Sequence, residues 1–133
     1  MRETNRATAL KFFEHLYAGS LEGALDLMTV DGVYRVFGDP AHFPLAGSYD
    51  KDHIVDLLGT IGPTVPRGVN PTITSTVADG DVVAVIGHVE AVAATGLNYA
   101  NNFVFLVTLR DGTITKVDEY IDTLHANQVL FGA

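Results

Sequence analysis

The residues best suited to chemistry lie in the segment "VDEYIDT", which runs from Val117 to Thr123. In a β-strand, alternate side chains face opposite sides, so Glu119 would share one face with Val117 and Ile121. A carboxylate among apolar side chains is costly unless it has a partner, a raised pKa or a functional role. We predict that Glu119 lines a pocket and transfers protons; the alternative is that it accepts hydrogen bonds from a helix or loop and is structural.

A second pair of polar side chains lies in the β-rich segment of residues 82–92. His88 and Glu90 are two residues apart and would therefore share a face. We expect His88 to act with Glu119, provided that the turn after this strand brings it to the same side of the sheet. A hydrogen-bonded core or interface role for His88, and a solvent-facing position for Glu90, are the alternatives.

The Asp-Gly hairpin turn near the C-terminus predicts the partners of Glu119. Pairing Arg110 with Thr113 across this turn would place Glu119 opposite Val104, with Asn102 two residues further along the same face. An amide at that position could donate a hydrogen bond to a substrate oxygen that gains charge. Alternatively, Asn102 holds a turn or strand edge by local backbone bonds.

Further candidates would line the site. Tyr17 and Tyr34 could each add a hydroxyl donor, and Val36 lies on the same predicted strand as Tyr34. Desolvation in an apolar pocket would raise the pKa of Glu119 toward neutrality. With an imidazole and an amide nearby, such a set can move a proton beside a carbonyl group.

The sequence offers no support for a metal or a cofactor. The five histidines, at positions 15, 42, 53, 88 and 125, lack close ligand spacing, and there is no cysteine. There is also no Gly-rich phosphate loop between a strand and a helix and no serine nucleophile elbow. We predict neither a metal nor a cofactor.

Composition and charge limit the partners. With 8 basic and 16 acidic residues, the net charge is −8, which opposes binding to nucleic acid and to anionic membranes. There is no apolar segment of signal-peptide or membrane-spanning type. We therefore expect a cytoplasmic protein, and 133 residues fit one domain, residues 1–133.

Periodicity divides the chain into helices followed by strands. Apolar residues at helical spacing predict helices over residues 4–18, 21–28 and 51–61, with a strand at 32–39 and a loop at 39–50. Two Asp-Gly turns, at residues 79–81 and 111–112, predict two hairpins and hence four long strands in a meander. This order indicates an α+β fold with the helices on one face of a curved antiparallel sheet.

This element order, together with "NYANNFVFLVTLRDGTITKVDEYID", resembles the SnoaL-like branch of the nuclear-transport-factor-2-like superfamily. The resemblance implies a cone-shaped barrel of a curved antiparallel sheet packed against three N-terminal helices. It also implies a pocket inside the cone and, in most cases, a homodimer. Relatives include polyketide cyclases, limonene epoxide hydrolases, ketosteroid isomerases, dehydratases and proteins without catalysis, so the fold does not give the function.

Two family patterns can be compared with the residues. The ketosteroid isomerase positions hold Phe12, Val36 and either Asn102 or Val104, so none of that family's three functional groups is retained. The limonene epoxide hydrolase positions hold the residues His88, Glu90 and Glu119. Both of that family's carboxylate positions stay acidic, but its arginine is replaced by the histidine.

The residues and the resemblance together favour a cofactor-independent acid/base enzyme of isomerase, cyclase or dehydratase type. Its substrate would be a small, largely apolar or carbonyl-containing molecule, with Glu119 transferring the proton, His88 as its partner and Asn102 polarising an oxygen. The alternatives are an epoxide hydrolase that uses Glu119, Glu90 and His88, a ligand-binding protein without turnover, and a dimeric interaction domain. We expect the apolar tail of residues 123–133 to cover the cone mouth or a homodimer interface.

Overall fold

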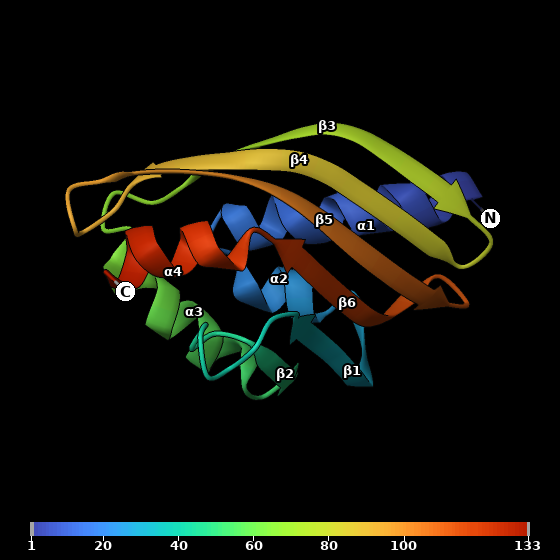
Figure 1. Cartoon of the computed structure of the whole chain (residues 1–133). Coiled ribbons are helices and arrows are strands. Elements are labelled where there is room, and N and C mark those ends of the chain that lie inside the picture. The colour runs from blue at the N-terminus through green and yellow to red at the C-terminus, as the bar shows by residue number, and fades with distance from the viewer. Residues whose placement is uncertain (1, 133) are drawn as a thin grey trace.

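The structure is a computed structural model that describes residues 2–132. Helices and strands follow one another along the chain as α1 (Arg2–Tyr17), α2 (Leu21–Leu25), β1 (Met28–Val36), β2 (Gly47–Asp50), α3 (Ile54–Ile61), the short 3₁₀ helix η1 (Gly62–Thr64), β3 (Asn70–Asp79), β4 (Val82–Val92), β5 (Asn98–Arg110), β6 (Thr113–Ile121) and α4 (Thr123–Phe131). The six strands form one curved sheet in the order β2-β1-β6-β5-β4-β3. Figure 1 shows α1 lying along the concave side of the long strands.

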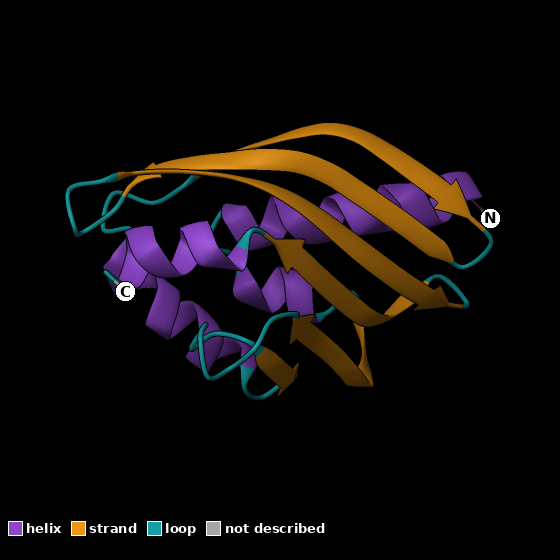
Figure 2. Ribbon diagram, in the orientation of Figure 1, coloured by secondary structure: helices purple, strands orange, loops and turns teal. Residues whose placement is uncertain are grey.

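The predicted α+β fold is confirmed: helices pack against a curved sheet that stays open and forms a cone (Figure 2). The first two strands, β1 and β2, precede the third helix, α3. The two predicted Asp-Gly turns join β3 to β4 and β5 to β6. Most strand pairs are antiparallel, but β1 and β6 pair in parallel. The second helix is shorter than predicted, because Met28 begins β1 instead of ending α2.

The apolar core lies between the helices and the concave face of the sheet. Side chains alternate strictly along β5, where every second residue from Tyr99 to Leu109 is buried. Phe13 of α1 packs against Phe105 of β5 with ring centroids 4.3 Å apart. The alternate side chains lie on the convex face. We call the concave face of the sheet the inner face and the convex face the outer face; polar groups on different faces are separated by the sheet.

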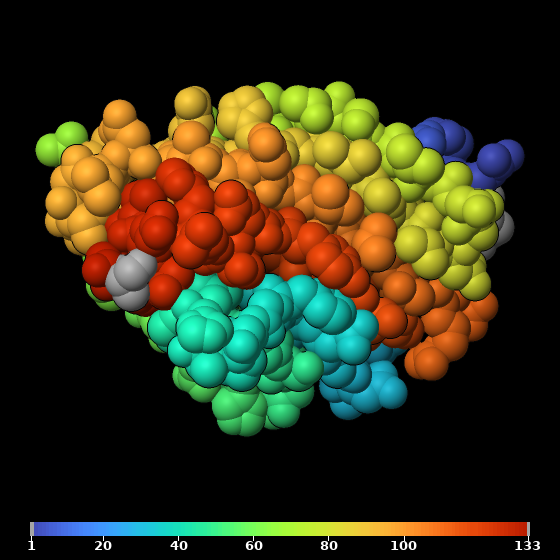
Figure 3. Space-filling model, viewed as in Figure 1, coloured from blue at the N-terminus to red at the C-terminus, as the bar shows by residue number. Residues whose placement is uncertain are grey.

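Helix α4 closes one end of the cone. Asp122 caps it by accepting a hydrogen bond from the backbone N–H of His125 at 3.1 Å. Ala126, Val129 and Leu130 are buried against the core. The C-terminal tail is therefore a helix that covers the cone within its own chain, beside the loop after β1 (Figure 3).

Candidate active site

Glu119 lies on the inner face of β6, among the core side chains. It is the register partner of Phe105 on β5 and of Val36 on β1, and both of these are buried. The hydroxyl of Tyr34, also on the inner face, donates a hydrogen bond to Oε1 of Glu119. Glu119 as a residue is half-buried, and its carboxyl group lies among the core side chains.

The carboxyl group of Glu119 has few protein groups that could offset the cost of burying its charge. Within residues 2–132, Tyr34 is its one hydrogen-bond partner and no cation forms an ion pair with it. Burial raises its pKa above the usual value, and the hydrogen bond from Tyr34 acts in the opposite direction. A raised pKa makes this carboxyl group a stronger base than an exposed carboxylate.

The negative charge of Glu119 affects the pKa values of four tyrosines, of which Tyr34 alone is hydrogen-bonded to it within residues 2–132. Burial is the main cause of a raised hydroxyl pKa in all four, and the negative charge of Glu119 adds to each shift. These residues are Tyr17, Tyr34, Tyr49 and Tyr99, and the pKa of Tyr99 rises to about 12. Their hydroxyls stay protonated at physiological pH, so they can serve as hydrogen-bond donors. The sequence predicted two of these residues, Tyr17 and Tyr34, and missed Tyr49 and Tyr99. The alternation of β5 could have identified Tyr99, because it shares a face with Phe103 and Phe105.

His88 and Asn102 lie on the outer face and are cross-strand partners of each other. The expectation that they join Glu119 is wrong, because Glu119 pairs with Phe105, an inner-face residue. The remaining predicted lining residues divide in the same way. Tyr34 and Val36 are buried in the interior, whereas Tyr17 is 36% exposed. Glu90 and Val104 lie on the outer face.

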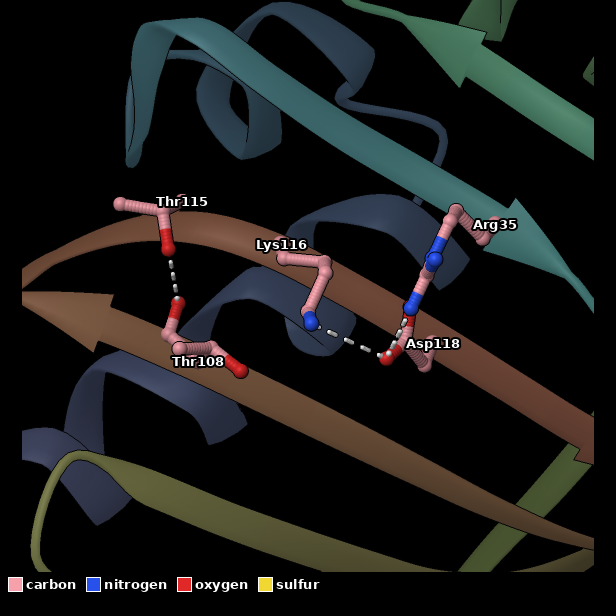
Figure 4. Close-up of polar contacts among 5 residues, drawn as sticks. All are labelled: Arg35, Thr108, Thr115, Lys116 and Asp118. Carbon is pink, nitrogen blue, oxygen red and sulfur yellow. Dashed lines mark hydrogen bonds and ion pairs between the residues drawn. The ribbon is translucent and has the colours of Figure 1, made fainter.

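The cause of this difference is a β-bulge in β6. Arg110 pairs with Thr113 as predicted, but the register shifts between Thr108 and Leu109, so Thr115 has no partner residue across the strand pair. The Thr115 hydroxyl instead donates to the backbone oxygen of Thr108 at 3.2 Å (Figure 4). One extra residue reverses the face of everything beyond it, and therefore Glu119 is opposite Phe105 instead of Val104.

The outer face carries its own polar cluster. Asp118, buried there, accepts two hydrogen bonds from Arg35, at 2.7 and 3.0 Å, and lies 3.7 Å from the ammonium group of Lys116 (Figure 4). Nearby, the rings of Phe37 and Tyr120 stack with centroids 4.5 Å apart. A hollow of about 350 Å³ lies beside this stack, lined by residues that include His88, Asn102 and Val104.

A larger hollow, of about 560 Å³, lies between α4 and the loop after β1, lined by residues such as Pro44, Leu124 and Phe131. Within residues 2–132, no group of three His, Asp or Glu side chains is placed to hold a metal ion. None of the helices described is long and apolar enough to cross a membrane. Neither of these two hollows is lined by Glu119, whose carboxyl group faces the core of the cone.

The open cone of a curved sheet with helices on its concave side, and an acid group inside, defines a protein of the nuclear-transport-factor-2-like class. The family model described as "SnoaL-like domain" matches residues 9–117. The chain belongs to this SnoaL-like family.

Solved structures with low sequence identity share the fold. An NTF2-like protein from Burkholderia xenovorans LB400 is 24% identical, with 98% of each chain covered and a TM-score of 0.80. TerC, crystallised with polyporic acid, is 22% identical over 96% of this chain and 98% of its own, with a TM-score of 0.86. A candidate SnoaL-like polyketide cyclase from Jannaschia sp. CCS1 is 16% identical over 99% and 94%, with a TM-score of 0.82. None of the curated proteins compared with this chain matches it.

Proposed function

We propose that this protein is a cofactor-independent acid/base enzyme that moves a proton on a small, largely apolar molecule inside the cone. The observation that carries the proposal is the state of Glu119, a half-buried residue whose carboxyl group has a raised pKa and one hydroxyl partner. Within residues 2–132 no cation pairs with it, unlike a buried carboxylate in an ion pair.

The proposed step is proton abstraction from a carbon beside a carbonyl group. The Glu119 carboxylate takes the C–H proton, the electron pair moves to the carbonyl oxygen as an enolate, and the protonated Glu119 returns the proton to the same or another carbon. Burial strengthens the carboxylate as a base by raising its pKa. Protonated tyrosine hydroxyls in the interior can stabilise the oxygen as it gains charge.

A direct test measures hydrogen–deuterium exchange of 2-tetralone and cyclohexanone in deuterated water by proton NMR. The wild-type protein should accelerate exchange, and Glu119→Gln should lower the acceleration by about 10²–10⁴-fold, the usual contribution of a general base. Glu90→Gln is the matched control, because Glu90 is exposed on the outer face. Exchange that persists unchanged in Glu119→Gln would refute the assignment.

Two other functions are distinguished by the same experiment. Water activation for epoxide hydrolysis by Glu119, Glu90 and His88 is not favoured, because the sheet separates Glu119 from the other two residues. If the ketones bind but their protons do not exchange, ligand binding without turnover replaces the enzyme proposal.

We also propose that a second copy of the chain covers the outer face, as the family resemblance implies. This face presents the stacked pair Phe37 and Tyr120 and, on β3 and β4, Val77 and Val82, all with more than a third of their surface exposed. A surface of this kind is typical of interaction sites. Sedimentation velocity should show a dimer for the wild-type protein and a monomer for Tyr120→Arg; a monomeric wild type would contradict the proposal.

A further inference from the structure

The start of β5 extends past the end of its neighbour β6. The first residue of β5 that pairs with β6 is Phe103, opposite Ile121 at the end of β6, so residues 98–102 have no strand on this side. Helix α4 lies beside this part of β5 (Figure 1). Backbone groups on this side of β5 therefore need partners from α4 or from the turn that leads into it.

Two uncharged side chains attach α4 to the sheet. Asn101 is buried on β5, where its Oδ1 accepts the backbone N–H of Asp122 at 3.1 Å and its Nδ2 donates to the backbone oxygen of the same residue at 3.0 Å. At the other end of α4, the hydroxyl of Thr95 donates to the backbone oxygen of Val129 at 2.7 Å. Amides and hydroxyls of this kind do not titrate near neutral pH, so these contacts do not depend on it.

The third attachment is the imidazole of His125. Its Nε2 accepts a hydrogen bond from the backbone N–H of Ala100 on β5, with 3.3 Å between the nitrogens. A backbone N–H can only donate, so Nε2 carries no proton and the ring is neutral, with its proton on Nδ1. The ring of Tyr99 stacks on the imidazole, with centroids 5.6 Å apart and an angle of 14° between the planes. This stacking keeps the imidazole against the strand.

A proton on Nε2 would remove this attachment. Both nitrogens of a protonated imidazole are donors, so Nε2 would face the N–H of Ala100 with a hydrogen of its own. His125 is also the third residue of α4, and the positive end of the helix dipole disfavours a cation in the first turn. Two independent effects, a lost acceptor and an unfavourable helix position, thus favour the neutral ring in the attached helix.

The acidic groups on the neighbouring elements do not offset these effects by pairing with the imidazole. They are Asp122 at the start of α4, Glu90 on β4 and Glu119 on β6, and within residues 2–132 none of them forms an ion pair with His125. The carboxylate of Asp122 accepts the backbone N–H of His125 instead. His42 borders the hollow on the other side of α4 and lies 3.9 Å from Asp39.

We propose that His125 makes the closure of the cone by α4 sensitive to pH. The neutral imidazole attaches the helix to β5, and uptake of a proton on Nε2 detaches this point, so that α4 leaves the end of the cone more often in acid. Histidine is the side chain that ordinarily changes its charge between pH 5 and 8. The inference concerns access to the interior and does not depend on the reaction proposed above.

Hydrogen–deuterium exchange of the α4 amides at pH 7.5 and pH 5.0 tests the proposal. Rates are divided by the intrinsic rates at the same pH, and the resulting protection of residues 126–131 is compared with that of residues 103–109 of β5 in the same sample. In the wild-type protein this ratio should fall about three- to tenfold at pH 5.0, as expected for the loss of one hydrogen bond.

Two substitutions of His125 separate the acceptor from the titration. His125→Gln offers an oxygen that can accept the N–H of Ala100 but takes up no proton, so the ratio should stay high at both pH values. His125→Ala has no acceptor, so the ratio should be low at both. His42→Gln is the matched control, because it removes a titrating histidine beside α4 that has no bond to β5, and it should keep the wild-type pH dependence.

The position of the proton can be measured directly. Nitrogen-15 NMR of the imidazole at pH 7.5 should show Nδ1 protonated and Nε2 unprotonated in His125. A proton on Nε2 at this pH, a wild-type ratio that does not change with pH, or a pH dependence that persists in His125→Gln would each overturn the inference. His125→Gln keeps the test decisive if His125→Ala folds poorly.

Discussion

Asp118 and Glu119 are neighbours on β6, yet they have opposite surroundings. Asp118 faces outward and is only 4% exposed, but it is held by a two-bond contact with Arg35 and by Lys116. Glu119 faces inward and has the hydroxyl of Tyr34 in place of a cation. The two acids are one residue apart in sequence, but only Asp118 has two positively charged side chains beside it.

The difference indicates which carboxylate the fold uses for its own stability. A buried carboxylate that contributes to stability needs a cation and satisfied oxygens, and Asp118 has both. Glu119 carries a cost that its surroundings do not offset, because burial raises its pKa. Such uncompensated groups cluster at functional sites, which makes the inner face, and not the outer one, the place to look for chemistry.

The largest stability effect should come from the outer acid. Asp118→Ala leaves Arg35 and Lys116 without a partner, but both keep access to water, so we expect a loss of about 2 kcal/mol, between the values for exposed and buried pairs. Urea denaturation provides the measurement, with Glu119→Gln as the comparison. A loss below about 0.5 kcal/mol would show that the Arg35 contact is not structural.

Tyr34→Phe should alter the pH dependence of proton exchange. The hydrogen bond from Tyr34 favours the charged form of Glu119 and so opposes the rise in its pKa that burial causes. Without it, the pKa of Glu119 rises further, the base form appears at higher pH, and exchange at a fixed mildly acidic pH falls several-fold.

Tyr49→Phe is the control for Tyr34→Phe, because the Tyr49 hydroxyl donates to a backbone oxygen and not to Glu119. Its exchange profile should keep the wild-type pH dependence. An acidic limb that stays in place in Tyr34→Phe, measured by NMR exchange rates between pH 4 and 8, would contradict the assigned role of this hydrogen bond.

Replacing Glu119 should change the free energy of unfolding in the opposite direction to replacing Asp118. The pKa of Glu119 is higher in the folded chain than in the unfolded chain, so its contribution to stability is complete below the unfolded pKa, about 4.3, and is lost as pH rises through the folded pKa. Glu119→Gln should thus be more stable than the wild type at pH 7 and no more stable at pH 4.

Urea denaturation of Glu119→Gln at these two pH values measures this difference, and Glu90→Gln, an exposed substitution on the outer face, should show no such pH dependence. If Glu119→Gln were destabilised at pH 7 as strongly as Asp118→Ala, the contrast between the two acids would disappear.

Much of the fold could be predicted from local signals. The turns at residues 79–81 and 111–112 and the helical spacing of residues 4–18 depend on neighbours along the chain, and the structure confirms them. The parallel pairing of β1 with β6 could not be predicted in this way, because its partners are about 85 residues apart. No local pattern reports such a contact.

The placement of the candidate site residues depends on both local and distant signals. Glu119 and Tyr34 follow from alternation within their own strands, and both face the interior. The position of Asn102 relative to Glu119 depends on the bulge at Thr115, a single residue without a distinctive signal in the sequence. The facing of His88 depends in the same way on the number of residues in the turn before Asn98. One residue more or less in such a turn moves every side chain of a strand to the other face.

The smallest effects should come from the two outer residues that the sequence associated with the site. His88→Ala and Asn102→Ala remove side chains that lie across the sheet from Glu119 and that make no hydrogen bond to it. We expect proton exchange within about twofold of the wild type and stability within about 0.5 kcal/mol. Measured with the same ketones and urea curves, a loss of exchange in either variant would mean that the outer face takes part in the chemistry. The contrast between Asp118 and Glu119 would then no longer separate structure from function.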